Sequence, residues 1–227
     1  MKVLIIGARP DSLGEHVRRA AVESEYSVVT AGVTEEDVHW DATIGDTAGL
    51  IELTRPDHVI CTLGINFMDE PFSYSLDMAH QLTVNAVVPM MLLSAWARYY
   101  SAGYPSGQLL SETHHFVVIG SNSASIARSS SAAYCMSKAA LAQGVRVASR
   151  SLARTNPGLS VYGYEPGLLE GTPMTAATAS GFLDKELHRM PTGKAIDTEW
   201  LAKLIVFNLR SGTNLTGCML RIDQGEQ

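Results

Sequence analysis

The chain of 227 residues is poor in cysteine and in positive charge, and each shortage excludes a class of protein. Its three cysteines stand far apart and form no CxxC pair, so neither a disulfide framework nor a zinc site is expected. Lysine and arginine total 17 against 23 acidic residues, which gives a formal net charge of -6. Nucleic-acid and anionic-membrane partners both require a basic surface. We therefore expect a cytoplasmic protein that binds neither partner.

Apolar runs long enough to cross a bilayer are also lacking. The first run ends at Ile6, is too short for a signal peptide and meets Gly7 at once, so we interpret it as a strand. The most apolar later stretch, 86–97, contains Pro89 and falls short of the roughly 20 residues that a membrane span requires. With 46% apolar residues the chain can bury a full core, and we expect residues 1–227 to form a single soluble domain.

Short β-branched runs alternate with longer stretches of helical period, which is typical of a parallel sheet whose crossover connections are helices. In one helical stretch the polar residues Glu15, Arg18 and Arg19 fall opposite the apolar ones. The pattern predicts an α/β Rossmann fold, with a doubly wound, mostly parallel seven-stranded sheet and helices on both faces. The predicted strands are 2–6, 27–30, 38–41, 58–62, 116–119, 159–164 and 218–222, and the predicted helices are 13–23, 47–53, 78–100, 131–154 and 198–210.

A turn between the first strand and the first helix contains Gly7, Arg9, Ser12, Leu13 and Gly14. In a doubly wound sheet this is the position at which the amides of a helix N-terminus bind a pyrophosphate. Ordinary strand-to-helix turns contain similar residues, so the position of the turn is stronger evidence for a dinucleotide site than its residue sequence is. We predict that these residues bind a dinucleotide.

The end of the second predicted strand bears on the choice of cofactor. A carboxylate at this point would bond the 2′-hydroxyl of NAD, but the sequence here is Thr30-Ala31-Gly32. Arg9 in the glycine turn offers a guanidinium for the 2′-phosphate of NADP. NADP is therefore weakly favoured, and the alternative is that Arg9 is a solvated loop residue.

Tyr134 and Lys138 stand four residues apart in a predicted helix, so both project from one face. The pKa of a free phenol is about 10, and a neighbouring ammonium lowers it toward neutrality. Ser121 precedes Tyr134 by thirteen residues and lies at the end of a central strand, where such sheets carry their sites. The competing interpretations are a core tyrosine with a solvated lysine, and a role for Ser123 or Ser125 in place of Ser121.

These landmarks, in this order, resemble the single-domain branch of the short-chain dehydrogenase/reductase family along essentially the whole chain. The resemblance implies that Tyr134 is the proton donor or acceptor, that Lys138 binds the nicotinamide ribose, and that Ser121 polarises the substrate oxygen. Asn85 is similar to the family asparagine that holds a water in the proton relay. A buried asparagine bonded within its own helix is the alternative.

The resemblance also implies further cofactor contacts, and the sequence departs from the family at some of them. Ser12 stands where the family has its middle glycine, Cys61-Thr62 replaces paired asparagines, and Gly171 is an insertion. The implied contacts are Asp41 near the adenine, Leu63 and Gly64 in the turn after the fourth strand, Pro166, Gly167 and Leu169 beside the nicotinamide, and Thr172 at its carboxamide.

The segment 172–193 is similar to the family's mobile flap over the substrate, and its apolar residues slightly favour a hydrophobic substrate. The alternative is that they only cover the sheet. Apolar residues such as Met91 and Trp96 exceed what one sheet face needs, which predicts a homodimer or homotetramer. His114-His115 lacks a partner at metal-ligand spacing, so we predict a loop pair and no metal site.

The predicted function is hydride transfer between a nicotinamide cofactor and a small carbonyl or alcohol substrate. The alternative is a catalytically silent regulator that keeps the fold and binds a nucleotide, although the presence of both Tyr134 and Lys138 argues against it. An enoyl reductase is expected to have a longer spacing from tyrosine to lysine. Seven residues after Tyr134 the sequence has Leu141 and not a lysine, so this reading fails.

Overall fold

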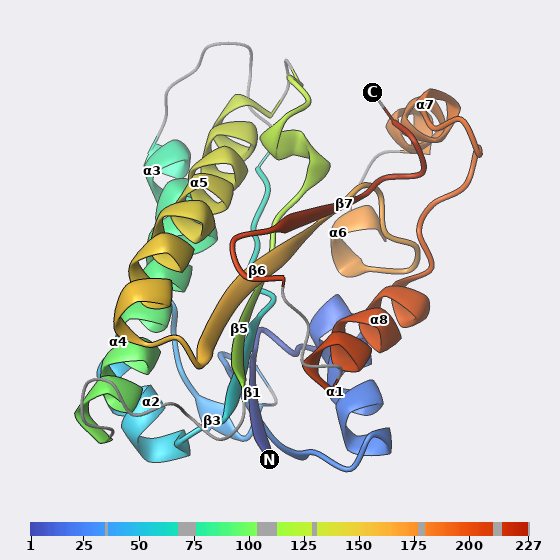
Figure 1. The fold of residues 1–227 in the computed structure, drawn as a ribbon. Coiled ribbons are helices and arrows are strands. Elements are labelled where there is room, and N and C mark those ends of the chain that lie inside the picture. The colour runs from blue at the N-terminus through green and yellow to red at the C-terminus, as the bar shows by residue number, and fades with distance from the viewer. Residues whose placement is uncertain are drawn as a thin grey trace.

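The computed structural model describes residues 1–34, 36–67, 76–103, 113–128, 131–176, 180–210 and 215–226. Seven strands in these residues form one sheet in the order β3-β2-β1-β4-β5-β6-β7, and every neighbouring pair is parallel (Figure 1). The predicted mostly parallel sheet is thus parallel throughout. The strands are β1 (Lys2–Ile6), β2 (Ser27–Gly32), β3 (Val38–His39), β4 (His58–Cys61), β5 (His114–Ile119), β6 (Leu159–Pro166) and β7 (Met219–Ile222).

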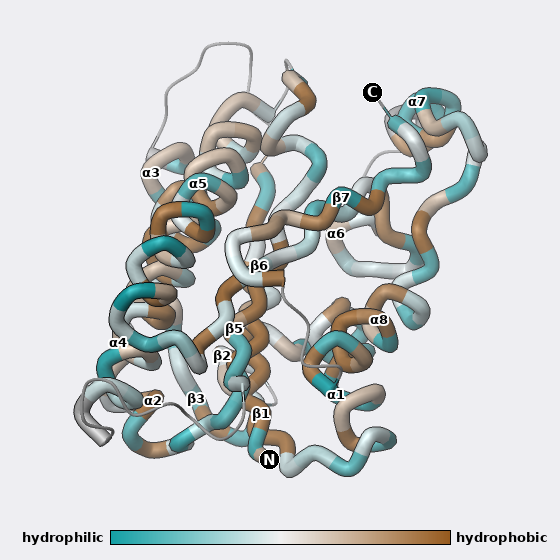
Figure 2. Tube along the Cα trace, viewed as in Figure 1, coloured by the Kyte–Doolittle hydropathy of each residue, from teal (hydrophilic) through white to brown (hydrophobic). Residues whose placement is uncertain are grey.

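Helices cover both faces of this sheet, which confirms the predicted fold class. Helices α1 (Leu13–Glu23) and α8 (Thr198–Arg210) lie on one face, and α2 (Thr47–Thr54), α4 (Val88–Gly103) and α5 (Ala132–Thr155) lie on the other (Figure 1). The shorter helices α3 (Leu76–Leu82), α6 (Pro173–Ala176) and α7 (Ser180–Arg189) lie toward the carboxyl ends of the strands. Figure 2 shows that the most hydrophobic stretches of the chain include the strands in the middle of the sheet.

Helix α1 shows how the sequence sets an element next to the site. The Ser12 hydroxyl caps its N-terminus by accepting from the Glu15 amide at 3.3 Å. Val17 and Ala21 are fully buried against the sheet, while Glu15 pairs with Arg18 on the outer side. The helix consequently has the predicted bounds, and its N-terminus faces the glycine turn.

The helix predicted at 78–100 is interrupted by a π-helical turn, η1 (Thr83–Val87), which joins α3 to α4. In the described part of the chain, Asp77–Ser101 is the one helix long and apolar enough, by length and composition, to cross a membrane. Its inner side chains Leu92 and Trp96 are fully buried in the core, and the core helices of soluble proteins pass the same test. The absence of a membrane partner stays a prediction.

The prediction that His114-His115 is a loop pair is wrong. Both residues belong to β5, where they pair with Leu159 and Ser160 of β6, and they are 8% and 0% exposed. The cause is position: β5 lies between β4 and β6, so its first residues are buried as deeply as its apolar ones. A neutral imidazole tolerates such burial, but histidine does not count as apolar in a hydrophobic pattern.

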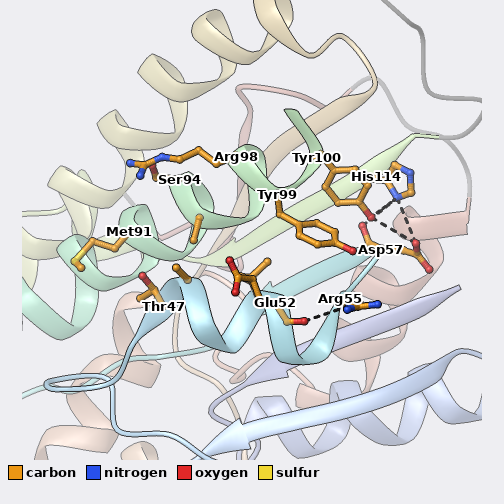
Figure 3. A pocket seen from close by; sticks show the side chains of 13 residues that line it. Thr47, Glu52, Arg55, Asp57, Met91, Ser94, Arg98, Tyr99, Tyr100 and His114 are labelled. Carbon is orange, nitrogen blue, oxygen red and sulfur yellow. Dashed lines mark hydrogen bonds and ion pairs between the residues drawn. The ribbon is translucent and has the colours of Figure 1, made fainter. Parts of the chain in front are cut away.

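The buried histidines form a cluster at the amino ends of β4 and β5. The rings of His58 and His115 stack at a centroid distance of 5.3 Å, and burial lowers the pKa of His58 to about 3 and that of His115 to about 4. His114 lies 3.3 Å from the Tyr100 hydroxyl and 3.2 Å from the Asp57 carbonyl oxygen (Figure 3). At physiological pH the lowered pKa values keep the first two imidazoles neutral.

A cavity of about 840 Å³ lies between α2 and α4. Figure 3 shows the side chains that line it. It is lined by residues of both helices, including Thr47, Glu52 and Met91, and it reaches Asp57, just before β4, and His114, the first residue of β5. Ser121, Tyr134 and Lys138 do not line it. This cavity is therefore separate from the predicted active site.

Candidate active site

The predicted site residues follow the carboxyl ends of parallel strands, so they lie along one edge of the sheet. A methyl group added at Gly64, after β4, would lie 3.5 Å from the Lys138 Nζ atom of α5. A methyl group at Gly167, after β6, would lie 3.3 Å from the Asn122 side-chain nitrogen. Segments distant in the sequence are thus in contact where the catalytic and nicotinamide-contact residues were predicted.

Lys138 is buried close to Tyr134. Its Nζ atom donates to the Ile119 carbonyl oxygen at 2.9 Å and lies 5.6 Å from the centroid of the Tyr134 ring. Burial lowers the pKa of Lys138 to about 8. A lysine with this pKa can lose and regain a proton near neutrality, as a proton relay requires.

The electrostatics of Tyr134 differ from the sequence-based expectation. Burial raises its pKa, while a hydrogen bond with Ser121 and the charge of Arg128 act in the opposite direction. The Lys138 ammonium points to a carbonyl oxygen and lies over the ring, so it is not the group that lowers the pKa here. In this structure the phenol is therefore held protonated, ready to donate.

Ser121 is the serine that the structure brings to Tyr134. Its buried hydroxyl hydrogen-bonds with the phenol, accepts from the Ser123 amide at 3.1 Å, and donates to Asn122 Oδ1 at 3.4 Å. The two competing serines have other partners: the Ser123 hydroxyl accepts from Arg128, and the Ser125 hydroxyl donates to the Asn122 carbonyl oxygen. The geometry favours Ser121 over both.

Asn85 lies in the π-helical turn and is fully buried. Its side chain donates to the Ile65 carbonyl oxygen and accepts from the Ile65 amide, both at 2.8 Å, and it donates to the Ser137 hydroxyl at 3.0 Å. These bonds leave its own helix and join the loop after β4 to α5. Pro89 has no amide proton to donate to the Asn85 carbonyl oxygen four residues earlier. That oxygen consequently lacks the usual α-helical partner.

The glycine turn brings the backbone at Gly14 close to the backbone at Gly7. Gly7 has a φ of 88°, and a methyl group at Gly14 would lie 2.5 Å from the Gly7 carbonyl oxygen. Thr62, after β4, fixes this turn by donating to the carbonyl oxygens of Ile6 and Gly7 at 2.8 and 3.0 Å. Sequence reasoning gave Thr62 no role, because its partner is 56 residues away.

The N-terminus of α1 fits a pyrophosphate through its backbone. The Ser12 hydroxyl is already used, since it donates to the Arg9 carbonyl oxygen at 2.6 Å and caps Glu15. Leu13 has a buried side chain, so its contribution to a ligand is its amide. The first amides of a helix have no acceptor within the helix and carry the positive end of its dipole. The cradle therefore suits a diphosphate without help from the Ser12 side chain.

A carboxylate lies at the end of β2 after all, contrary to what the sequence alone suggested. Glu36 folds back so that a methyl group at Gly32 would collide with its carboxylate, which also accepts from the Thr34 amide at 2.8 Å. Arg9 is exposed on the glycine turn. Asp41, expected near the adenine, accepts from the Thr43 amide and hydroxyl, which lowers its pKa.

The predicted nicotinamide contacts lie at the end of β6 and just beyond it. Pro166 closes the strand, the Gly167 amide donates to the Ile222 carbonyl oxygen at 2.8 Å, and Leu169 forms a bridge to Ile196. The Thr172 hydroxyl accepts from the Thr175 amide at 3.3 Å and so caps α6. Thr172 followed by proline at the first helical position is a start signal that the sequence already contained.

Comparison with known proteins identifies the class. Residues 2–227 match the family described as Enoyl-(Acyl carrier protein) reductase, a branch of the short-chain dehydrogenase/reductases. The chain belongs to the short-chain dehydrogenase/reductase family. It is an NAD(P)-dependent oxidoreductase.

Solved structures share the fold at low sequence identity. A short chain dehydrogenase family protein from Francisella tularensis is 18% identical with a TM-score of 0.82, over 99% of this chain and 98% of that one. BdcA in complex with NADPH is 20% identical with a TM-score of 0.79, over 99% and 93%. The aldohexose dehydrogenase of Thermoplasma acidophilum is 18% identical with a TM-score of 0.78, over 99% and 93%. A search of curated protein sequences gives no significant match.

Proposed function

We propose that the protein transfers a hydride between a nicotinamide dinucleotide and a small carbonyl or alcohol, with Tyr134 as the general acid and base. The observation that carries the proposal is the grouping of Ser121, Tyr134 and Lys138 at the carboxyl edge of the sheet, with Gly64 beside Lys138. A general acid must lie within hydrogen-bond reach of the oxygen that it protonates. A substrate oxygen placed between Ser121 and Tyr134 meets that condition.

In the direction of reduction, Ser121 and Tyr134 donate hydrogen bonds to the substrate oxygen, and the nicotinamide supplies the hydride when the cofactor is bound. Tyr134 then gives up its proton, and the two donors stabilise the charge that develops on the oxygen. Lys138, whose pKa is about 8, returns a proton to the phenol. Pro89 has no amide proton to donate to the Asn85 carbonyl oxygen. We propose that this oxygen holds the water of the relay.

The cofactor preference has support on both sides. Arg9 favours NADP(H) because an exposed guanidinium can pair with a 2′-phosphate, and we keep NADP(H) as the weakly favoured cofactor. Glu36 opposes this choice because its carboxylate, next to Gly32, would repel a phosphate and accept from a ribose hydroxyl. Titrating the purified protein with each cofactor, followed by nicotinamide fluorescence, tests the preference, and tighter binding of NAD(H) would reject it.

The segment 172–193 is proposed to be a flap over the substrate. It includes α6 and α7, and the Met174 methyl group would lie 3.9 Å from a methyl group at Gly64, beside Lys138. A flap in this place excludes water before the hydride moves. Its apolar side chains, such as Met174 and the buried Met190, slightly favour a hydrophobic substrate.

We further propose a cytoplasmic homodimer or homotetramer. Trp96, one of the residues from which assembly was predicted, is buried within this chain and no longer supports it. The support that remains comes from apolar side chains that are exposed on the outer surfaces of η1, α4 and α5. These are Val87, Met91, Met136 and Val147. The three cysteines are free, as a reducing compartment allows.

A panel of ketones, aldehydes and alcohols, assayed with NAD(H) and NADP(H), tests the proposed function. We expect cofactor oxidation or reduction with at least one class. An enoyl thioester belongs in the panel because the matching family is described by that activity. Turnover of the enoyl thioester alone would replace the proposed substrate class. Tight cofactor binding without any turnover would favour the silent regulator.

A further inference from the structure

Three segments that are distant in the sequence meet at Arg128, outside the residues assigned to catalysis above. The guanidinium Nη1 atom pairs with Glu186 of α7, and Nη2 lies 2.8 Å from Glu226 Oε1 in the segment after β7. The third nitrogen, Nε, donates to the Ser123 hydroxyl at 3.3 Å, two residues beyond the catalytic serine. Figure 1 shows α7 beside the segment that ends at C.

These charges are buried. The side chains of Glu186 and Glu226 are 6% and 2% exposed, and that of Arg128 is 13% exposed. Buried carboxylates require a charged partner, and the planar fork of arginine is suited to holding two of them. Glu186 also pairs with Arg189 at 2.6 Å, but that side chain is 59% exposed and the pair is screened by solvent. Without Arg128, two buried carboxylates would be left poorly compensated.

The same cluster reaches the catalytic serine. Glu226 uses its second oxygen, Oε2, to accept from the Asn122 side-chain nitrogen at 2.7 Å. A carboxylate can only accept, so the nitrogen of the amide must face Glu226 and its oxygen must face the other way. That oxygen accepts from the Ser121 hydroxyl at 3.4 Å. The charge on Glu226 thereby fixes the orientation of the Asn122 amide, which in turn accepts the hydrogen bond from the Ser121 hydroxyl.

We propose that Arg128 and Glu226 are positioning residues that couple closure of α7 to the orientation of the Ser121 hydroxyl. When α7 packs down, Glu186 completes the ion-pair cluster around Arg128. Arg128 in turn holds Glu226 against Asn122, and Asn122 orients Ser121. The bond from Ser121 to Asn122 is long, so a substrate oxygen can take its place. This inference rests on the proposed function for its effect on turnover, but the cluster itself can be tested without turnover.

Two isosteric variants separate the two arms of the cluster. Glu226→Gln has one acceptor oxygen where Glu226 uses two, so it must give up either Arg128 or Asn122. Glu186→Gln removes the charge that ties α7 to Arg128. Arg189→Gln is the matched control, because Arg189 pairs with the same Glu186 but is exposed to solvent. Arg128→Gln and Arg128→Lys complete the set, and if Arg128→Gln fails to fold, the isosteric pair still decides.

We expect Glu226→Gln to lower kcat by about tenfold with little change in KM, because it misplaces a group that acts in the transition state. Glu186→Gln should instead raise KM about tenfold by weakening closure over the substrate. Arg128→Gln should show both effects, Arg128→Lys should recover part of each, and Arg189→Gln should match the parent. Kinetics of Glu226→Gln and Glu186→Gln that equal those of the control would overturn the coupling.

Hydrogen exchange tests the cluster independently of turnover. Peptides covering 183–190 should exchange faster in Glu186→Gln, peptides covering 121–128 should exchange faster in Glu226→Gln, and both should do so in Arg128→Gln. Unchanged exchange in all three variants would refute the inference even in an active enzyme. If the parent shows no turnover with any substrate, the proposed function fails, whereas these exchange differences would still establish the cluster.

Discussion

The two ends of strand β5 show how differently buried ionisable groups are treated in one molecule. At the carboxyl end, Ser121 and Lys138 are buried but each has hydrogen-bond partners, and Arg128 is held by two carboxylates. At the amino end, His115 is fully buried and neither ring nitrogen has a hydrogen-bond partner within the described residues. Burial shifts pKa values at both ends. A shifted pKa indicates a site only where partners also converge on it.

The largest expected effect comes from removing the phenol at the carboxyl end. Tyr134→Phe should lower kcat by about a thousandfold, or ~4 kcal/mol, because it removes the general acid and base. The affinity for the cofactor should stay within about twofold, as measured by fluorescence titration. Tyr99→Phe, on α4 at the cavity between α2 and α4, is the control and should behave as the parent. Retained turnover in Tyr134→Phe would remove the functional distinction between the two ends.

The next effect tests the amino end through its pH dependence. On folding, the pKa of His58 falls from 6.5 to about 3 and that of His115 falls from 6.5 to about 4. Between its lowered pKa and pH 6.5, each histidine therefore binds a proton more readily in the unfolded chain than in the folded one. Above about pH 6.5 the two histidines therefore do not lower the free energy of unfolding. As the pH falls below 6.5, each of them lowers it by up to about 1.4 kcal/mol per pH unit.

Replacing one histidine of the cluster isolates this contribution. His115→Phe should recover about 3 kcal/mol of the free energy of unfolding at pH 4 and change it little at pH 7. Urea denaturation at both pH values measures the difference. His188→Gln, at an exposed histidine on α7, is the control and should leave the pH dependence unaltered. Equal acid sensitivity in His115→Phe and the parent would show that the cluster is not under this strain.

Lys138 sharpens the comparison because it is a buried charge kept for its chemistry. Burial lowers its pKa from 10.5 to about 8, a shift worth roughly 3 kcal/mol, and this cost is fully present below pH 8. Lys138→Met should lower turnover by less than Tyr134→Phe does, and yet raise the free energy of unfolding by about 2 kcal/mol at pH 7. This gain should fade as the pH rises from 8 to 10.5. A destabilised variant at pH 7 would show that the hydrogen bond to Ile119 outweighs the burial cost.

The smallest effect concerns the exposed rim of the carboxyl end. Arg9→Gln should weaken NADP(H) binding by a few-fold, about 1 kcal/mol, and leave NAD(H) unchanged, since an exposed ion pair contributes little. Glu36→Gln should act in the opposite sense by relieving repulsion of the 2′-phosphate. Calorimetric titration of both variants with both cofactors separates the two effects. A loss of NAD(H) binding in Arg9→Gln would place Arg9 elsewhere on the cofactor.

Much of the fold could be predicted because it depends on local patterns. The helices at 13–23 and 198–210 have the predicted bounds, since each has one apolar stripe and a polar residue at its start. The π-helical turn at Thr83–Val87 could not be foreseen, because the one residue that it adds to a turn is not marked by any particular residue type in the sequence. His114-His115 was misjudged because the burial of β5 comes from its neighbours in the sheet and not from its own residue types.

The candidate site divides in the same way. The pairing of Tyr134 with Lys138 follows from helical spacing, and the place of Ser121 follows from the end of a strand. The residues that were missed interact over long sequence distances: Thr62 reaches the glycine turn, and Glu226 reaches Asn122 across 104 residues. Glu36 was missed because it stands beyond the end of β2 and folds back. One sequence contains no pairing information at such separations.

The π-helical turn at Asn85 lets one continuous helix serve two surfaces. An α-helix turns by about 100° per residue, so the single extra residue rotates everything after it relative to everything before it. The turn itself presents Asn85 to the loop after β4, and the stretch after it presents Leu92 and Trp96 to the sheet. Deleting one residue here would keep the helix whole and point one of these two sets away from its target, so the length of this segment is as constrained as its side chains.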